Sequence, residues 1–240
     1  MKNLRKTKPV ESTMDTFHSI VMDTFDTACN VKTRLGGVYL SGCHVMDGQK
    51  YVCMDELMKD ILSNECVVYS FGIGGDMSFE KGISEMGCKV FAYDPTIDQA
   101  PYQSDNISFK KIGVVGTPSE DKNYQTLNEI LKSNGHSNTK ISYLKLDIES
   151  HELSGLPIWL DNGDLDNVEQ LAIEVHLEPP ESDITLKFLE TFLDLHLKGQ
   201  FRIVNWEANN CWKNYNKNVD YFGLSEILLK KTNPDNLCTI

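Results

Sequence analysis

Short runs of apolar, strand-forming residues alternate with amphipathic segments along most of the chain. The runs cover residues 67–71, 89–93, 107–115, 141–146, 169–175, 201–205 and 221–229. Around them apolar residues recur at helical spacing, as in residues 55–64, where we expect Leu57, Met58, Ile61 and Leu62 to face the core. Seven strands with alternating helices predict a doubly wound α/β fold on a mostly parallel sheet.

A different pattern precedes this array. Phe17, Ile20, Val21 and Phe25 are spaced as on one face of an amphipathic helix. We therefore predict an N-terminal extension over residues 1–54 and a main domain over residues 55–240, with the extension packed on the domain as a cover over its site. A length of 240 residues suits one large domain with such an addition.

The charge of the chain narrows the choice of partners. Asp and Glu number 35 against 23 Lys and Arg, which gives a formal net charge of −12. Because clustered cations are needed to hold a long phosphate backbone, we do not expect nucleic acid as a partner. No stretch approaches the ~20 consecutive apolar residues of a membrane-spanning helix. The oligomeric state is left open.

The cysteines leave two alternatives open. Seven occur, at positions 29, 43, 53, 66, 88, 211 and 238, and none has the Cys-x-x-Cys or Cys–His spacing typical of zinc sites. They form two or three disulfides in the lumen of the secretory pathway, or they are small buried apolar residues in a reduced cytoplasm.

The most informative motif is a strand, a glycine loop, a helix and a second strand that ends in an acid. The strand 67–71 runs directly into Gly72, Gly74 and Gly75, where the backbone can turn sharply and approach a ligand. Asp76 can cap the following helix. Asp94 closes the second strand 22 residues after Gly72, and the dinucleotide fold has its ribose-binding acid about 20 residues on.

The loop chemistry distinguishes between cofactors. Nicotinamide and flavin enzymes use G-x-G-x-x-G, but here the third position is Met77, and Asp76 would repel a diphosphate. S-adenosylmethionine carries a sulfonium and an ammonium, and an acid at the loop suits that cationic ligand. The loop therefore favours a methyl donor over a dinucleotide.

Several motifs resemble those of a known family. They are Val68-Tyr-Ser-Phe-Gly-Ile-Gly-Gly-Asp-Met-Ser-Phe-Glu80, Lys145-Leu-Asp-Ile-Glu-Ser-His-Glu152, Ile173-Glu-Val-His176 and Asn205-Trp-Glu-Ala-Asn209, with Arg34-Leu-Gly-Gly37 and 47–53 upstream. They resemble the animal methyltransferase-like proteins related to FkbM-type methyltransferases, of the class I S-adenosylmethionine-dependent kind. The resemblance spans Arg34 to Leu229. It implies a Rossmann-like sheet whose seventh strand runs antiparallel beside the sixth, and O-methylation of a hydroxyl on a sugar, glycan or small metabolite.

Candidate cofactor residues follow from the motif and the resemblance. The loop is expected to hold the amino acid end of the cofactor, the turn after the second strand its ribose, residues 112–113 its adenine, and Asp147 its methionine part. The residues are Phe71, Gly72, Ile73, Gly74, Gly75, Asp76, Asp94, Pro95, Thr96, Ile112, Gly113 and Asp147.

Catalytic and acceptor-binding candidates lie beyond the ends of later strands, where open α/β sheets bind ligands. His176 is the expected general base, since an ordinary imidazole pKa of ~6.5 allows it to accept a proton near neutrality. The alternative is a histidine satisfied by neighbouring carbonyls, and Asp147 can be a simple helix cap. With Asp147 and Glu149 as the other catalytic candidates, the acceptor-facing set is His151, Glu174, Trp206, Glu207 and Asn209.

Other functions remain as rivals. A nicotinamide-dependent oxidoreductase uses the same kind of sheet, although the broken glycine spacing argues against it. A non-catalytic binding module can also keep the fold. Carboxylates at the strand ends are ligands that Mg²⁺ accepts, but no spacing demands a metal and none is predicted.

Overall fold

The computed structural model describes residues 29–42, 44–149, 151–176, 183–208 and 224–232. In these ranges seven strands form one sheet in the order β12-β13-β11-β10-β5-β6-β7. Only β13 is antiparallel to its neighbours, and it lies between β11 and β12. The predicted α/β sheet with an inserted antiparallel last strand is therefore confirmed. The strands are β5 (Val67–Phe71), β6 (Lys89–Tyr93), β7 (Ile107–Lys110), β10 (Tyr143–Leu146), β11 (Gln170–His176), β12 (Phe201–Ala208) and β13 (Leu224–Lys231).

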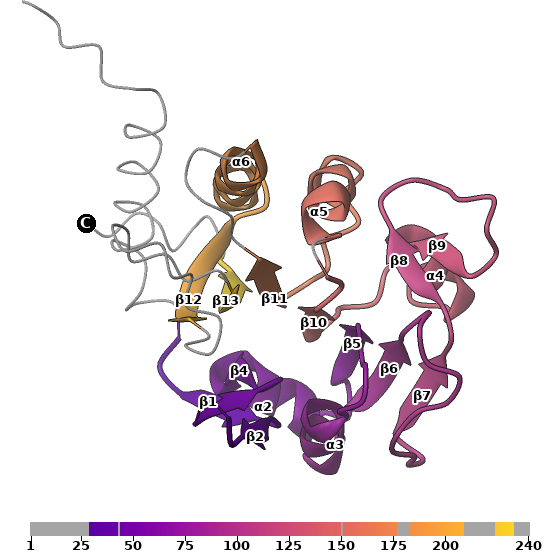
Figure 1. Cartoon of the computed structure of the whole chain (residues 1–240), viewed down its shortest axis with the longest axis vertical. Helices are drawn as coiled ribbons and strands as arrows, with labels where there is room; N and C mark the ends of the chain where they lie inside the picture. The colour runs from indigo at the N-terminus through magenta and orange to yellow at the C-terminus, as the bar shows by residue number, and fades with distance from the viewer. Residues whose placement is uncertain (1–28, 43, 150, 177–182, 209–223, 233–240) are drawn as a thin grey trace, which may run out of the picture.

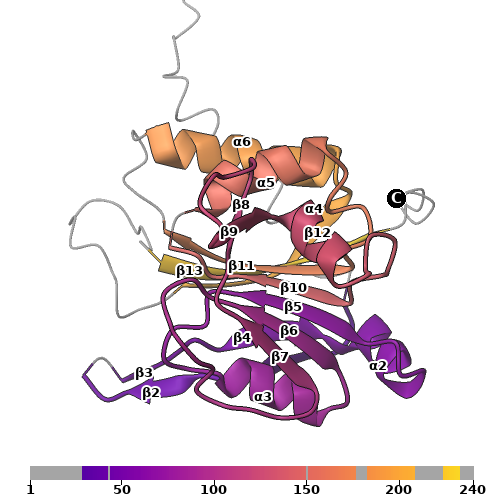
Figure 2. The same ribbon diagram turned by 90° about the vertical axis from the view of Figure 1, so that its right-hand side faces the viewer.

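Helices cover both faces of this sheet (Figures 1 and 2). On one face lie α4 (Leu127–Ser133), α5 (Glu152–Asp161) and α6 (Asp183–Leu197), and on the other lie α2 (Met54–Leu62) and α3 (Ser78–Glu85). None of the helices in the described ranges is both long and apolar enough to cross a membrane.

The sheet separates two apolar cores. Tyr69, Leu146 and Ile173 pack towards α5 and α6, whereas Val68 and Val90 pack towards α2 and α3. Every residue of β5 and β10 is buried. A strand covered on both faces needs apolar side chains on both, which is why these strands were readable as continuous apolar runs.

Two details of the predicted elements are wrong. The expected strand over 107–115 is two strands, β7 and β8 (Gly113–Val115), and β8 pairs with β9 (Tyr124–Thr126) in a separate small sheet. In α2, Leu57 is buried, but Met58 is 39% exposed and Leu62 is 78% exposed. Fewer apolar residues of this helix therefore face the core than its sequence predicted.

Part of the N-terminal extension forms a layer of its own. In it, β1 (Lys32–Leu35) pairs antiparallel with β4 (Lys50–Cys53), and β2 (Val38–Leu40) pairs with β3 (Val45–Asp47) as a hairpin that projects beyond the sheet in Figure 2. We call residues 29–53 the N-terminal strap. The amphipathic helix expected around residues 17–25 lies outside the described residues.

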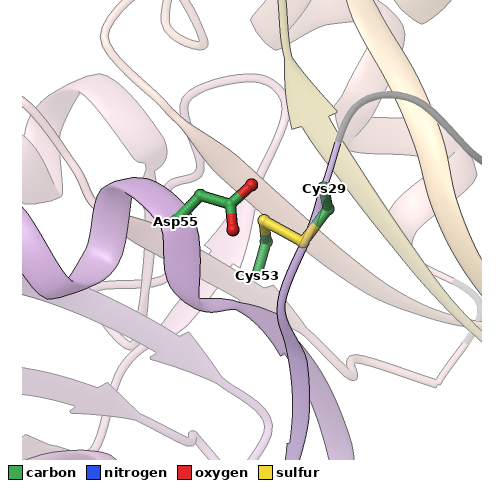
Figure 3. Close-up of side chains that lie close together, drawn as sticks. All are labelled: Cys29, Cys53 and Asp55. Atoms are coloured by element: carbon green, nitrogen blue, oxygen red, sulfur yellow. A yellow bond between two sulfur atoms is a disulfide. The ribbon is translucent and has the colours of Figure 1, made fainter.

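One disulfide closes the strap, and a second lies within the glycine-loop unit. Cys29 is bonded to Cys53, and Cys66 is bonded to Cys88. Figure 3 shows Asp55 beside the first disulfide, where its carboxylate accepts hydrogen bonds from the backbone N–H groups of Asn30 and Val31. Of the two alternatives for the cysteines, these four form disulfides and are not free buried thiols. Positions 43, 211 and 238 lie outside the described residues.

Candidate functional site

Acids from five strands lie in one row at the carboxyl edge of the sheet. Phe71 pairs with Tyr93 and with Leu146, and Leu146 pairs with Ile173, so the next residues of these four strands form the following row. Glu174 in that row pairs with Glu226, which pairs with Glu207. We call Asp94, Asp147, Glu174, Glu226 and Glu207 the acid row. Because residues in one row point to the same face, the strand ends bring together carboxylates far apart in the sequence.

Gly72 occupies the position between Asp94 and Asp147. It has a φ of +79°, and a Cβ there would lie 1.6 Å from the carbonyl oxygen of Asp147. The residue is thus required for the close approach of β5 and β10, rather than for ligand space. Around Gly74 and Gly75, in contrast, an added Cβ would meet nothing within 4 Å. The open side of the loop is at these two glycines.

The carboxylate of Asp94 holds the glycine loop. Its Oδ2 accepts hydrogen bonds from the backbone N–H groups of Ile73 and Gly74, both at 2.8 Å, and its Oδ1 accepts from the N–H and hydroxyl of Thr96 at 2.7 and 2.6 Å. Burial would raise the pKa of Asp94, but these four bonds hold it below its ordinary value. Four donors fill the roughly four lone-pair sites of a carboxylate. A ribose diol would therefore have to replace some of them.

Asp76 joins the loop to the strap. Helix α3 begins at Ser78 and its N-cap residue is Met77, so the helix starts one residue later than the predicted cap at Asp76 would place it. Asp76 still accepts hydrogen bonds from the N–H and hydroxyl of Ser78, at 2.9 and 2.7 Å. The Ser78 hydroxyl oxygen in turn accepts the Gly37 N–H at 2.6 Å. A Cβ on Gly36 would lie 2.4 Å from the Phe79 nitrogen, so this glycine allows a close approach of the strap to the start of α3.

Lys50 of the strap lies among the acids. Its side chain is 1% exposed, and its ammonium donates to Asp147 Oδ2 at 3.1 Å and to Glu226 Oε1. Burial would lower the pKa of Lys50, but the charges of Glu226, Asp147 and Glu174 raise it above its ordinary value. The strap therefore supplies a permanent cation to the middle of the row. At the far end, Arg34 and Gln49 of the strap hydrogen-bond to Glu207 at 2.8 and 3.2 Å.

The pKa values of Asp147 and Glu174 are shifted in opposite directions. Burial raises the pKa of Glu174, and its hydrogen bond to Asp147 and the charge of that group raise it further. Burial would also raise the pKa of Asp147, but the charges of Lys50 and Lys145 and the hydrogen bond from Glu174 hold it well below its ordinary value. Of the two carboxyls, Glu174 therefore favours its protonated form, and Asp147, beside the glycine loop, favours its ionised form.

A second buried lysine supports the loop from below. Lys145 Nζ donates to the Gly72 carbonyl at 2.5 Å and lies 3.7 Å from Asp147 Oδ2. It also lies 3.6 Å from Glu80, whose carboxylate accepts the Ser70 hydroxyl. These contacts fix the end of β5, the end of β10 and the start of α3 relative to one another.

The segment after β10 does not use Asp147 as a helix cap. Helix α5 begins at Glu152, with His151 as its N-cap residue, and no side chain caps it. Glu149, at a φ of +55°, and His151 are exposed, while Glu152 is 1% exposed and accepts the Ile148 N–H at 2.7 Å. Asp147 is therefore a member of the acid row, whereas Glu149 and His151 follow it in the sequence and are exposed to solvent.

The remaining candidates are distributed around these groups. The rings of Phe71 and Tyr93 stack at 5.1 Å, under the loop. At Gly113 an added Cβ would lie 2.6 Å from the Tyr124 ring and 3.1 Å from Pro95 Cγ, so these three residues, with Ile112 beside them, form one patch next to Asp94. This places the predicted ribose and adenine residues together.

The predicted acceptor-facing residues near the last strands are only partly brought together. Trp206 and Glu207 lie within β12 and not in a loop, so the two side chains point to opposite faces. Trp206 packs against Phe188 of α6, and only Glu207 joins the acid row. His176 is the last residue of β11. Its side chain, and all of Asn209, lie outside what the structure describes.

Comparison with known proteins gives the family. A family described as a methyltransferase domain matches residues 6–222. The chain belongs to this family. It is 29% identical over 147 residues to the human "Probable methyltransferase-like protein 24", which covers 56% of this chain and 40% of the human protein, and 30% identical over the same length to the rat protein of that name. The chain thus spans about two fifths of the length of these curated relatives.

Solved structures with a similar fold are distant. The methyltransferase domain of METTL16 matches with a TM-score of 0.46 and 10% identity, over 96% of this chain and 85% of that one. A Burkholderia thailandensis 1,6-didemethyltoxoflavin-N1-methyltransferase with bound S-adenosylhomocysteine matches with a TM-score of 0.40 and 12% identity, over 75% and 78%. The family membership supports S-adenosylmethionine as the cofactor.

Sequence reasoning missed three charged residues of this methyltransferase domain: Lys50, Lys145 and Glu226. Each is a lone charge among buried apolar neighbours. Lys50 shares the inward face of β4 with Val52, Lys145 stands inside the apolar run 141–146, and Glu226 stands between Leu224 and Ile227. A charge at an inward position of a strand must find a partner in the fold, and that was the available signal.

The acid row also resembles a cation site. Carboxylate oxygens of Asp147, Glu174 and Glu226 lie within 4.8 Å of one another. The ammonium of Lys50 contacts two of these carboxylates and supplies the positive charge that Mg²⁺ would otherwise bring. The donor set therefore gives no separate reason to assign a metal.

Proposed function

We propose that the chain transfers the methyl group of S-adenosylmethionine to a hydroxyl of a sugar, glycan or small metabolite, as in FkbM-type O-methyltransferases. The observation that carries the proposal is the open side of the glycine loop next to an ionised acid. Gly74 and Gly75 border free space, and Asp147 lies directly beyond Gly72 in the same row. Family membership makes the reaction class a methyl transfer, and the loop indicates where the donor binds.

The residues present fit the donor. The cofactor would supply an electrophilic methyl group on a positively charged sulfur. An ionised Asp147, held in that state by two lysines, suits a ligand with positive charge. Residues 72–76 would hold the amino acid end, Asp94 to Thr96 the ribose, and Ile112 and Gly113 the adenine. The ribose hydroxyls would donate hydrogen bonds to Asp94 Oδ1 in place of the N–H and hydroxyl of Thr96.

The acceptor would approach along the remaining acids of the row. Glu207 has the most exposed side chain of the acid row, at 31%, and it forms an ion pair with Arg34 of the strap. We retain His176 as the proposed base, with Asp147 and Glu149 as the other catalytic candidates. His151 and Glu174 are proposed to face the acceptor, together with Trp206 and Asn209. The strap is proposed as the cover over this end of the site.

The protein's own contribution to rate is then mainly alignment. Holding donor and acceptor in line can lower a barrier by ~7–11 kcal/mol in favourable cases, and a base adds to this when the acceptor is a hydroxyl. Contacts of Lys50 from β4 and Lys145 from β10 hold the middle of the acid row in place.

The test fills the open side of the loop. Gly75→Val places a branched side chain where an added Cβ meets no atom, and the φ of Gly75 is not in the left-handed region. The variant should therefore keep its melting temperature. If the donor lies against the loop, the variant should lose S-adenosylmethionine binding in calorimetry, because the side chain occupies the ligand's place.

The matched control is Gly42→Val. Gly42 also borders free space and also has no positive φ, but it lies in the β2–β3 turn. This variant should bind like the wild type. Equal S-adenosylmethionine affinity in all three proteins would place the donor elsewhere, and stronger binding of NADH than of S-adenosylmethionine would favour the oxidoreductase alternative.

A further inference from the structure

The N-terminal strap contributes a charged side chain to the interior of the candidate site. Lys50 stands at the start of β4, and 97 residues of sequence separate it from Asp147 and 176 from Glu226. Strand β4 packs on β11 and β13, which carry Glu174 and Glu226. The strap therefore meets the acid row through a buried ammonium, not only through surface contacts.

The groups that face Asp147 from the elements around it show why this ammonium matters. They are Lys50 of β4, Lys145 of β10, Glu174 of β11, Glu226 of β13 and Glu152 at the start of α5. Three of the five are acids. Lys145 also serves Glu80 and the Gly72 carbonyl. Lys50 is the cation that contacts both Asp147 and its neighbour Glu226.

We propose that Lys50 is a positioning residue for the methyl donor: its ammonium, 3.1 Å from Asp147 Oδ2, holds that carboxylate beside the glycine loop, so that the strap controls the affinity of the site for a cationic ligand. This inference rests on the proposed function, because it assumes that the donor lies against Asp147. Lys50 itself does not touch the donor and acts through the carboxylate.

The consequence of removing the charge follows from electrostatics. Without Lys50, Asp147 is a partly buried carboxylate beside Glu226 and Glu174, with Lys145 at 3.7 Å as its remaining cation. Its partial burial and the nearby acids then favour its protonated form more than in the wild type. A neutral Asp147 no longer attracts a sulfonium or an ammonium. A higher pH favours the ionised form again, so the loss of affinity should become smaller as pH rises.

The experiment measures the dissociation constant for S-adenosylmethionine against pH in wild type, Lys50→Met and Lys50→Arg. The ratio of the Lys50→Met constant to the wild-type constant should rise from about pH 8 to about pH 6, by up to about tenfold for each pH unit over which Asp147 of the variant is protonated. Lys50→Arg keeps the cation and should keep the ratio nearly constant. Using ratios cancels the other groups that titrate in both proteins.

The control is Lys140→Met. Lys140 also pairs with a buried carboxylate, that of Asp60 at 2.9 Å, but it precedes β10 and lies at the opposite end of that strand. Its removal should lower stability without a pH-dependent change in affinity. If Lys50→Met does not fold, Lys50→Gln keeps a hydrogen-bond donor without the charge and gives the same readout.

The outcomes separate this inference from the proposed function. If wild type does not bind S-adenosylmethionine at any pH, the proposed function fails. If wild type binds and the Lys50→Met ratio is the same at both pH values, Lys50 is only a structural ion-pair partner and the inference is wrong. A ratio that depends on pH for Lys50→Met but stays nearly constant for Lys50→Arg supports the inference.

Discussion

Glu152 should make folding stability depend on pH in a way that one substitution removes. Its side chain is almost fully buried and accepts the Ile148 N–H. Burial raises its pKa from an ordinary 4.5 to about 7, with the charges of Asp147 and Glu149 adding to the rise and the backbone hydrogen bonds opposing it. The folded chain therefore binds the Glu152 proton more tightly than the unfolded chain does.

The sign and size follow from linkage. Between about pH 4.5 and pH 7 the unfolded state has released this proton and the folded state has not, so stability from this group is present at low pH and is lost as pH rises. At about 1.36 kcal/mol per pH unit, the loss amounts to roughly 3 kcal/mol. Glu152→Gln keeps an oxygen acceptor for Ile148 and cannot ionise. Relative to wild type, it should gain roughly 3 kcal/mol of unfolding free energy from low pH to about pH 8.

The assay is urea denaturation of both proteins at a series of pH values. Glu129→Gln is the control: this exposed glutamate accepts the Thr126 N–H at 2.8 Å, which lowers its pKa, so its variant should lose stability relative to wild type as pH rises. A Glu152→Gln difference that stays constant across the pH range would refute the reasoning, whatever its size.

Two further predictions concern the scaffold. Gly72→Ala should destabilise the fold by more than the roughly 1–2 kcal/mol that positive φ alone costs, because its Cβ would overlap the Asp147 carbonyl; Gly74→Ala, also at positive φ but in free space, should show only the smaller cost in urea denaturation. Equal losses would contradict the close approach of β5 and β10. Cys29→Ser should lower the unfolding free energy by roughly 3–4 kcal/mol, the value for a loop of this length. An unchanged stability, with no mass difference between oxidised and reduced wild type, would contradict the disulfide.

The central strands of the sheet were readable from the sequence because their environment is simple. Strands β5 and β6 have the predicted bounds, 67–71 and 89–93. Each is a largely apolar run that ends at a glycine or an acid, because the two packed faces of a central strand favour apolar side chains. The acids at their ends followed from the same strand ends.

The parts that were wrong depend on tertiary context. The break between β7 and β8 occurs where Ile112 N–H bonds back to the Lys110 carbonyl and Gly113 N–H bonds to Asn123, and no local pattern announces this. The apolar Met58 and Leu62 are exposed because α2 contacts the sheet through a limited stripe. Similarly, Lys50 and Glu226 meet across 176 residues, so only the fold reveals their contact.

The account depends most on the donor binding at the glycine loop, and calorimetric titration of the wild-type chain with S-adenosylmethionine tests this directly. We predict saturable binding of one molecule per chain that Gly75→Val abolishes and Gly42→Val preserves. No heat of binding at millimolar ligand, from protein with an intact cooperative melting transition, would contradict it.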